Sequence, residues 1–329
     1  MPRVHFLNVR NGDCSIIQHA SERTSVIDVN CAFIPAATKT ALAEYSEKSW
    51  KPVPGNYDQK SDEDNPIEYL RKLKVDQIFR FIVTHPDMDH LGGVKDLFTE
   101  FSPINIWDTA NNRERDERSF GSRTKLKEDW EFYKYIRDRR THEDSNPKRL
   151  VYYSGNVNEY YKTDDLKILA PTPALIETGN KKQKWNDASY VILYHTAGDK
   201  KILFAGDSED KTWDHVLTEW KDEVSNLDVL IAPHHGRHSG RNYDFLDVTK
   251  PKLTLYGNAP SEHQGYDAWS NRGLLKLTNN QAGYIILDIG SGGIDVYVKN
   301  EKYARNIAEE NQNEPRYSAE LDAWYLGKL

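Results

Sequence analysis

The segment over residues 84–93, THPDMDHLGG, constrains the fold and the chemistry of this chain more than any other feature. It follows the apolar run 77–84, which predicts a buried strand, and precedes a helix predicted over 93–101. Four side chains able to bind a metal fall within six residues: His85, Asp87, Asp89 and His90. Alternate residues of an extended loop point the same way, so the first three can converge on one ion while the fourth turns to a second. The pattern predicts a metal centre at a strand-to-helix junction; a solvated polar loop is the alternative.

Two later strand ends carry residues of the same kinds. Asp207 follows the apolar run 203–205, where its carboxylate could bridge two ions or cap the next helix. His234 and His235 follow the run 230–233 as adjacent imidazoles. Adjacent residues of a strand face opposite sides, so we expect only one of the two to bind an ion directly, and the sequence leaves open which one.

The succession of strands predicts an α/β fold. Strands are predicted over 4–9, 15–18, 24–29, 77–84, 104–107, 150–153, 166–170, 189–195, 201–205, 227–233, 252–256, 283–289 and 293–298. Helices are predicted over 36–50, 66–73, 93–101, 125–140 and 210–220, with a packed C-terminal helix around 321–326. Because strands follow one another instead of alternating strictly with helices, mixed sheets in a four-layer sandwich are favoured over a doubly wound parallel sheet. The polar run 51–65 predicts an exposed loop.

Composition narrows the class of protein. With 329 residues, 38% of them hydrophobic, the chain is long enough for one large domain or two small ones. No apolar run approaches the roughly 18 residues of a membrane span, and the start lacks a secretory signal. Cys14 and Cys31 are too few for a thiolate zinc cluster and suit a reducing compartment. We therefore expect a soluble, cytoplasmic protein that has no membrane partner.

The formal net charge of -7 argues against indiscriminate binding of polyanions, so any phosphate site is expected to be local. A charged stretch over 111–149 departs from this balance, with 12 Lys and Arg against 9 Asp and Glu. Its predicted helix carries aromatic residues among the charges. These residues could hold single-stranded nucleic acid by stacking and charge, or the helix could be amphipathic with one wet face.

Together, these motifs resemble the metallo-β-lactamase fold and, within it, the hydrolase domain of the DNA-uptake protein ComEC and its stand-alone relatives. The resemblance covers most of residues 3–298. It is most specific over 85–93, which matches the motif THpDaDHiGG, with Asp87 where most other branches of the superfamily have His. Residues 5–13 resemble the opening hfidVGqGD, with Asn8 in place of the usual Asp.

Further segments match in family order. Residues 26–28 match the strand end liDtG, 186–189 match NnxS and 203–207 match lLltGD. Residues 234–236 match HHGs as far as Arg237, which stands where the family has Ser. No third-motif histidine is found. The family's transmembrane channel is also missing, so DNA translocation is not expected of this chain.

The resemblance implies a hydrolase domain over 1–298, built as a four-layer αββα sandwich with two mixed sheets and carrying the charged insertion at about 111–149. Residues 299–329 would form a C-terminal helical tail. The resemblance also implies two divalent ions, zinc or manganese, with the ligands His85, Asp87, Asp89, His90, Asp207 and either His234 or His235. The catalytic residues would be Asp89, Asp207 and His235, with Asp207 bridging the two ions.

Residues around the implied centre would support it. The candidates for orienting or supplementing the ligands, or for transferring protons, are Asp28, Asn186, Asp187, His238 and His263. Just past the HHG segment, Arg237 and Arg241 could clamp a phosphate or lie solvated at the surface. We interpret His142, His195 and His215 as surface or structural residues.

These features favour a phosphodiesterase or nuclease. Two adjacent cations would generate hydroxide at neutral pH and clamp both oxygens of a phosphoryl displacement. Asp87 in place of an imidazole shifts the preference from zinc toward manganese. A small-molecule hydrolase acting on a cyclic nucleotide, phosphoester, lactone or thioester is the alternative with the same ions. An alternative of another class is a non-catalytic module that binds a protein partner through the insertion or the C-terminal tail.

Overall fold

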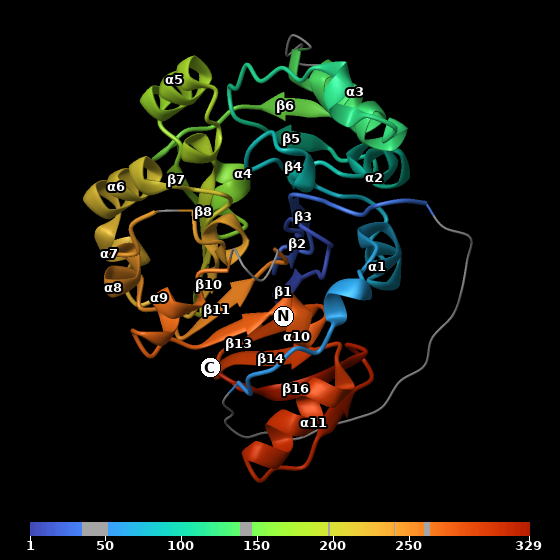
Figure 1. Ribbon diagram of the computed structural model, residues 1–329, viewed down its shortest axis with the longest axis vertical. Coiled ribbons are helices and arrows are strands. Elements are labelled where there is room, and N and C mark those ends of the chain that lie inside the picture. Colours follow the sequence, from blue (N-terminus) through green and yellow to red (C-terminus); the bar gives the residue numbers. More distant parts are fainter. Residues whose placement is uncertain (35–51, 139–146, 197, 240, 260–263) are drawn as a thin grey trace.

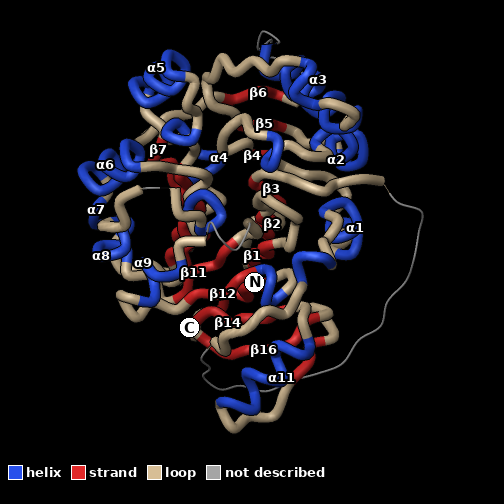
Figure 2. The backbone as a smooth tube through the Cα atoms, in the orientation of Figure 1, coloured by secondary structure: helices blue, strands red, loops and turns tan. Residues whose placement is uncertain are grey.

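Two mixed β-sheets lie face to face, and helices cover their outer faces (Figure 1). The structure is a computed structural model that describes residues 1–34, 52–138, 147–196, 198–239, 241–259 and 264–329. The helix predicted over 36–50, and the residues His142 and His263, lie outside the described residues. Figure 2 shows strands at the centre with helices on both sides, in four layers. The predicted α/β fold with two mixed sheets is therefore confirmed.

The larger sheet has ten strands in the order β15-β16-β14-β13-β1-β2-β3-β4-β5-β6. Their bounds are β1 (Arg3–Phe6), β2 (Ser15–Gln18), β3 (Thr24–Ile27), β4 (Arg80–Ile82), β5 (Asn105–Trp107), β6 (Lys148–Leu150), β13 (Ile285–Gly290), β14 (Gly293–Val298), β15 (Arg316–Ser318) and β16 (Ala323–Lys328). Strands β3 to β6 pair in parallel, whereas β1 pairs antiparallel with both β2 and β13. The carboxyl ends of β3 and β4 therefore lie side by side.

The smaller sheet has six strands in the order β12-β11-β10-β9-β8-β7. Their bounds are β7 (Leu166–Ala170), β8 (Val191–His195), β9 (Lys201–Phe204), β10 (Val229–Ile231), β11 (Leu253–Tyr256) and β12 (Lys276–Thr278). Strands β9 to β12 are parallel, and β7 and β8 are antiparallel to their neighbours. Four consecutive carboxyl ends consequently share one edge of this sheet.

Eleven α-helices are present in the described part of the chain. Their bounds are α1 (Pro66–Lys72), α2 (Val94–Phe101), α3 (Thr124–Asp138), α4 (Glu159–Lys162), α5 (Pro173–Lys182), α6 (Asp210–Glu219), α7 (Lys221–Val224), α8 (Phe245–Thr249), α9 (Tyr266–Ser270), α10 (Asn279–Ala282) and α11 (Glu301–Glu310). Helices α1 to α3 pack on the outer face of the larger sheet, and α6 to α9 pack on that of the smaller sheet. None of the described helices is long and apolar enough to cross a bilayer.

The alternation of side chains along β8 shows why both faces of a sheet are covered. Ile192 and Tyr194 point into the cluster between the sheets, while Val191 and Leu193 point into the outer cluster that contains Trp213 of α6. All of these side chains are buried. Burying an aliphatic side chain of this size contributes roughly 1.5–3 kcal/mol, so the apolar β8 is stable only as a strand sandwiched between two layers.

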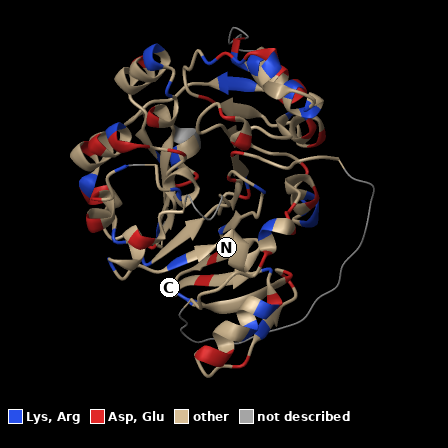
Figure 3. Cartoon of the chain, in the orientation of Figure 1, with Lys and Arg blue, Asp and Glu red and all other residues tan. Residues whose placement is uncertain are grey.

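The charged insertion joins the larger sheet through β6, and its helix α3 packs on α2. Trp130 and Tyr133 of α3 are buried, and Asp129 accepts hydrogen bonds from the backbone N–H groups of Gly93 (2.8 Å) and Lys95 (3.1 Å) at the start of α2. Figure 3 shows acidic and basic residues side by side on α3. The helix is therefore amphipathic with one wet face. The rings of Trp130 and Tyr133 are not available for stacking on bases, because both are buried.

The C-terminal segment 299–329 is not a helical tail. It contains α11 followed by β15 and β16, and β16 pairs antiparallel with β14 of the larger sheet. The helix predicted around 321–326 is wrong because the apolar side chains there alternate between two faces. Ala323 and Tyr325 pack in the outer cluster, whereas Leu326 packs between the sheets.

The run 51–65, predicted as an exposed loop, is only partly exposed over its described residues 52–65. Val53 and Tyr57 pack against the cluster between the sheets. Asp64 and Asn65 are buried, and Asp64 accepts a hydrogen bond from the backbone N–H of Asn8 at 3.0 Å. Lys60 Nζ donates to the backbone oxygen of Ala259 just after β11, and Gln281 just after β12 donates to that of Val53, so the segment 52–60 lies beside the ends of these strands.

Candidate metal centre

The candidate ligands follow the carboxyl ends of strands from both sheets. In the larger sheet, β4 leads into the segment 85–90, whose last three residues form a short helical turn. In the smaller sheet, β9 leads to Asp207, and β10 leads to the pair 234–235. Parallel strands bring their carboxyl ends to one edge of each sheet, and the contacts of Asp207 with the histidines show that these two edges lie together.

The buried carboxylate of Asp207 lies at the centre of this cluster. Its Oδ2 atom is 3.6 Å from His85 Nε2 and 3.5 Å from His234 Nε2. Its Oδ1 atom is 3.3 Å from His90 Nε2 and 3.6 Å from His235 Nε2. Two imidazoles thus face each oxygen of one carboxylate, which is the arrangement that a carboxylate bridging two ions requires.

Two further carboxylates complete the cluster. Asp87 Oδ2 lies 3.5 Å from His85 Nε2, and Asp89 Oδ2 lies 3.5 Å from His235 Nε2. We call one group the Asp87 side and the other the Asp89 side. The Asp87 side consists of His85, Asp87 and His234. The Asp89 side consists of Asp89, His90 and His235.

The unpartnered atoms of the cluster fit metal ions. Buried polar atoms in proteins nearly always have a hydrogen-bond partner. Several buried atoms here have none among the described residues: His85 Nε2, His90 Nε2, His235 Nε2 and Asp207 Oδ1. The donor atoms of His85, His90 and Asp207 lie within 4.8 Å of one another, as do those of Asp89, His90 and His235. Imidazole nitrogens and carboxylate oxygens are suitable ligands for zinc and manganese.

The backbone of the HHG segment explains how two adjacent imidazoles reach the same carboxylate. The expectation that the two rings face opposite sides is wrong, because β10 ends at Ile231 and a short helical turn follows. His234 (φ 52°, ψ 47°) and His235 (φ 56°, ψ 20°) both adopt the left-handed conformation, which is uncommon for residues other than glycine. Both rings consequently face Asp207 instead of opposite sides. Such local strain typically persists where function requires it.

Carboxylates orient the imidazoles of the Asp89 side. Asp28 Oδ2 lies 2.7 Å from His90 Nδ1 and also accepts a hydrogen bond from the Thr84 hydroxyl at 2.7 Å. Asp13 Oδ1 lies 3.0 Å from His235 Nδ1, which is ion-pair distance, although the two atoms are not aligned for a hydrogen bond. The structure thus places Asp28 where the sequence predicted an orienting residue. A carboxylate on the second ring nitrogen fixes the ring and increases its basicity toward a metal.

The predictions from sequence gave Asp13 no role, although Asp13 belongs to the segment 5–13 that resembles a family motif. It follows Asn11 and Gly12 in the turn between β1 and β2. Gly12 has a φ of 117°, and a Cβ atom there would lie 2.0 Å from the backbone oxygen of Asp89. Only glycine allows this close approach. The Asn-Gly-Asp sequence therefore brings the turn against the Asp89 side and delivers the Asp13 carboxylate to it.

Two arginines of the insertion hold the carboxylate of Asp87, and sequence analysis missed both. Arg115 Nη2 lies 2.7 Å from Asp87 Oδ1, and Arg113 Nη1 pairs with the same oxygen. The guanidinium of Arg113 also lies 4.5 Å from the centre of the Trp185 ring. Both arginines are about four-fifths buried (side-chain exposure 17% and 18%). They leave Asp87 Oδ2 directed toward His85.

The imidazoles of the Asp87 side have weaker supporting contacts. His85 Nδ1 lies 3.2 Å from the Thr84 hydroxyl. His234 Nδ1 lies 4.0 Å from Glu209 Oε1, beyond hydrogen-bond distance. Neither ring nitrogen thus has a close carboxylate partner among the described residues.

The two imidazoles of the HHG segment differ in pKa because different charged groups surround them. Burial alone would raise the pKa of Asp207, but the surrounding imidazoles hold it well below its usual range. Burial lowers the pKa of His234 to about 4. Burial also opposes the charged form of His235, but Asp207 and Asp13 raise its pKa to about 10. At neutral pH, Asp207 and His234 have the charge states that bind a metal, whereas His235 would have to release a proton.

Several residues predicted to support the centre have other contacts. Asn186 and Asp187 form a short helical turn before β8, and Asp187 Oδ1 accepts a hydrogen bond from the backbone N–H of Lys211 in α6 at 3.1 Å. His238 is exposed, and its Nδ1 lies 3.0 Å from the Tyr243 hydroxyl. These contacts connect surface segments of the smaller sheet. The structure shows no contact of these side chains with the ligands among the described residues.

The two arginines predicted beyond the HHG segment differ in burial. Arg241 is only 5% exposed, so it is not a solvated surface residue. Its Nη1 donates to the backbone oxygen of Ser208 at 3.0 Å, and its buried Nη2 has no partner among the described residues. Arg237 is half-buried, and its backbone N–H donates to the oxygen of His234 at 2.8 Å. Arg241 thus supports the segment directly after Asp207.

No family model and no curated protein matches this sequence. Solved structures resemble the overall fold at low identity. Igni18, a metallo hydrolase from the archaeon Ignicoccus hospitalis, is 10% identical, with 88% of this chain and 100% of that chain covered and a TM-score of 0.46. A diphosphatase from the PhnP family is 12% identical (88% and 98% covered, TM-score 0.43), and the metallo-β-lactamase SMB-1 is 12% identical (70% and 76%, TM-score 0.35). At these values the likeness carries no information about the reaction or the substrate.

Proposed function

We propose that this protein is a two-metal hydrolase of phosphoesters. The observation that carries the proposal is the position of Asp207, whose two oxygens each face two imidazoles at 3.3 to 3.6 Å. Asp87 and Asp89 add one carboxylate on each side. In this proposal both His234 and His235 are ligands, and His234 takes the place of the third-motif histidine that the sequence does not contain.

The chain's own residues would position and charge the site. When bound, two divalent ions would supply a water of lowered pKa and stabilise charge on the phosphoryl oxygens. Asp207 would set the separation of the ions. Asp13 and Asp28 would hold the rings of His235 and His90 in fixed orientations. This preorganisation matters because a catalytic group held loosely loses much of its effect.

The charge of the centre favours an anionic substrate. The carboxylates of the centre are those of Asp87, Asp89 and Asp207 among the proposed ligands and those of Asp13 and Asp28 against the imidazoles, and together they exceed the charge of two divalent cations by one. Arg113 and Arg115 add two positive charges at Asp87, in a chain with a formal net charge of -7. A local positive site on an acidic protein attracts a small anionic group more than a long polyanion. A phosphodiester is the substrate class that combines this charge with the need for two ions.

The proposal also specifies the metal ions and the kind of nucleic acid that is the substrate. The ComEC-like motifs and the harder ligand Asp87 support manganese or zinc as the ion and a short or single-stranded nucleic acid as the substrate. The structure of the insertion supports nucleic-acid binding less than the composition of the insertion does. Its lysines on α3 pair with carboxylates: Lys125 with Asp96, Lys127 with Glu117 and Lys134 with Glu114.

The test is the metal-dependent turnover of defined esters. The protein loaded with manganese or zinc should hydrolyse bis(4-nitrophenyl) phosphate, and Asp207→Ala should abolish this activity because both ions lose their common ligand. Elemental analysis should find about two ions per chain in the wild type. His195→Ala is the matched control, since His195 lies at the end of β8 and pairs with Asp199 at 2.7 Å.

Different outcomes identify the alternatives. Hydrolysis of 4-nitrophenyl acetate or a lactone, without turnover of any phosphodiester, would replace the phosphoesterase with a carboxylic ester hydrolase. A protein that binds no metal at stoichiometric level would contradict the proposal altogether. That result would favour a non-catalytic, partner-binding module.

A further inference from the structure

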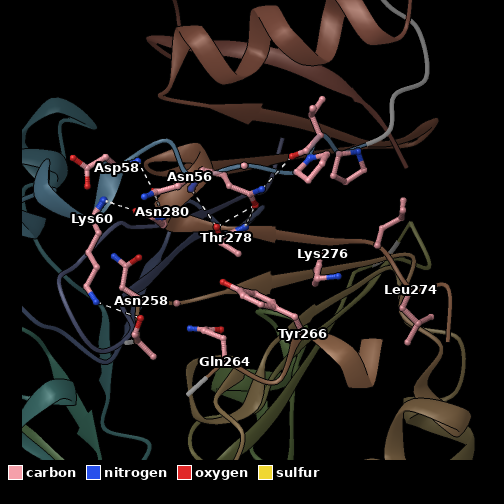
Figure 4. Close-up of a pocket in the computed structure, with 18 residues that line it drawn as sticks. Asn56, Asp58, Lys60, Asn258, Gln264, Tyr266, Leu274, Lys276, Thr278 and Asn280 are labelled. Atoms are coloured by element: carbon pink, nitrogen blue, oxygen red, sulfur yellow. Dashed lines mark hydrogen bonds between the residues drawn. The ribbon is translucent and has the colours of Figure 1, made fainter. Parts of the chain in front are cut away.

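A cavity of about 800 Å³ lies between the segment 52–60 and the ends of β11 and β12 (Figure 4). The lining includes Gly257, which directly follows β11, and Thr278, which is the last residue of β12. Because β9 to β12 are parallel, the cavity lies at the same sheet edge as Asp207 and the HHG segment. Neighbouring strands are about 4.8 Å apart, so the cavity begins one strand away from the proposed ligands.

Two lining residues connect the cavity to the HHG segment. A Cβ atom on Gly257 would lie 2.2 Å from Asp13 Oδ1 and 3.3 Å from His235 Cβ, so this glycine lets the cavity wall touch the residues that orient the Asp89 side. Gln264 donates from Nε2 to the backbone oxygen of His235 at 3.4 Å, and its backbone pairs with Arg237. A ligand in the cavity would therefore lie beside the metal centre.

The lining combines an aromatic ring with amide side chains. Figure 4 shows the Tyr266 ring between Asn258 and Lys276, with Gln264 beside it. The Oε1 atom of Gln264 is buried and has no partner among the described residues. Asn258 is 3% exposed, and its Nδ2 donates to Asn8 Oδ1 at 2.6 Å, which fixes the orientation of the amide. The amides of Asn258 and Gln264 thus form a fixed polar wall of the cavity.

The charged residues of the lining favour an anion. Lys60 Nζ lies 3.3 Å from the backbone oxygen of Ala259, and Lys276 Nζ lies 2.6 Å from the Ser270 hydroxyl. Neither lysine forms an ion pair with a described residue. Asp58 is the acidic residue among the described residues of the lining. Two lysines against one carboxylate give these described residues a net positive charge.

We propose that this cavity binds the nucleoside part of a nucleotide substrate whose phosphate lies at the metal centre. The proposal rests on the proposed function and specifies its substrate class. Amide side chains pair with the hydrogen-bonding edges of bases, an aromatic ring stacks on their faces, and lysines contact further phosphates. The volume falls within the range of about 300–1,000 Å³ that is typical of small-ligand sites.

The first experiment compares two substrates in the metal-loaded protein. One is the 4-nitrophenyl ester of adenosine 5′-monophosphate, and the other is methyl 4-nitrophenyl phosphate, which has no base. In Tyr266→Leu and in Lys276→Gln, the ratio of kcat/KM for the first substrate over the second should fall about tenfold, mainly through KM. The control Tyr135→Leu, on an exposed tyrosine of α3, should leave the ratio at its wild-type value.

The second experiment measures binding without turnover. Adenosine 5′-monophosphate should bind the wild-type protein in isothermal titration calorimetry and bind both cavity variants at least about tenfold more weakly. If no ester is hydrolysed but this difference is found, the cavity assignment stands and the proposed function fails.

Three outcomes would overturn the cavity assignment. One is equal affinity of ribose 5-phosphate and adenosine 5′-monophosphate, which would indicate a sugar phosphate site. Another is equal binding of the nucleotide by wild type and variants. The last is an unchanged substrate ratio in both Tyr266→Leu and Lys276→Gln.

Discussion

The Asp87 side and the Asp89 side of the candidate metal centre share Asp207 but differ in what supports their ligands. On the Asp89 side, Asp28 and Asp13 contact the imidazoles at 2.7 and 3.0 Å. On the Asp87 side, the carboxylate ligand itself is held by two arginines. Carboxylate support strengthens a ligand, whereas an arginine competes with the metal for the same carboxylate. We therefore expect one tight and one weak ion site.

The largest expected effect is a difference in metal retention between alanine variants of the two histidines of the HHG segment. After dialysis against metal-free buffer, His234→Ala should retain about one ion per chain, because the Asp89 side stays intact. His235→Ala should retain less than one ion per chain, because only the weaker Asp87 side remains intact. Both variants should lose activity by orders of magnitude. Equal metal retention in the two variants, measured by elemental analysis, would refute the difference between the sides.

The next effect concerns the orienting carboxylates. Asp28→Asn and Asp13→Asn should weaken metal binding by about 10- to 100-fold at the Asp89 side, because the rings of His90 and His235 lose their anionic partners. Competition with a chromophoric chelator measures this change. Asp187→Asn serves as control, since Asp187 contacts the backbone of α6. Wild-type affinity in both orienting variants would mean that these contacts only stabilise the fold.

A smaller effect, of mixed sign, is expected from the arginine pair. Combining Arg113→Gln with Arg115→Gln should free Asp87 for a metal ion and so tighten the weaker site several-fold. The same variant should raise KM for a phosphodiester by roughly tenfold, because two positive charges beside the phosphate are lost. Arg118→Gln is the control, because Arg118 is exposed and pairs with Asp116. Tighter metal binding without a change in KM would remove the arginines from substrate binding.

A separate effect concerns the stability of the fold and tests the sheet instead of the candidate metal centre. His5 of β1 is buried between Tyr69 and Gln18, and burial lowers its pKa from 6.5 to about 4. Its neutral form contributes fully above pH 6.5, and this contribution is lost as the pH falls toward 4, because the unfolded chain binds the proton more readily. The loss is on the order of 3 kcal/mol. Denaturant unfolding at pH 7 and pH 4.5 should show a smaller pH effect in His5→Gln than in the wild type.

Sequence patterns predicted those parts of the candidate site whose residues lie close together along the chain. The segment 85–90, Asp207 and the HHG pair each stand directly after an apolar strand, and parallel strand ends meet at one edge. The direction of the HHG rings was not predictable from strand periodicity. It depends on two consecutive left-handed residues, and the backbone adopts that conformation only in its tertiary context.

The contacts that the sequence did not reveal are distant along the chain. Arg113 and Arg115 appeared as members of a charged stretch, and nothing in their spacing indicated that they reach Asp87. The strand β16 was mistaken for a helix because four apolar residues near 321–326 fit either period in so short a run. Pairing with β14 decides between the two, and that partner is more than twenty residues away in the sequence.

The residues of the candidate metal centre come from both sheets, and this has a mechanical consequence. The segment 85–90 extends from β4 of the larger sheet, whereas Asp207 and the HHG pair extend from β9 and β10 of the smaller one. Ions bound there would fasten the two halves of the sandwich, much as a disulfide fastens two distant segments. A ligand at 100 times its dissociation constant adds about 2.7 kcal/mol to the free energy of unfolding. The melting temperature of this protein should therefore rise with the concentration of free metal, so the metal supply of its surroundings would set how firmly the two sheets are held together.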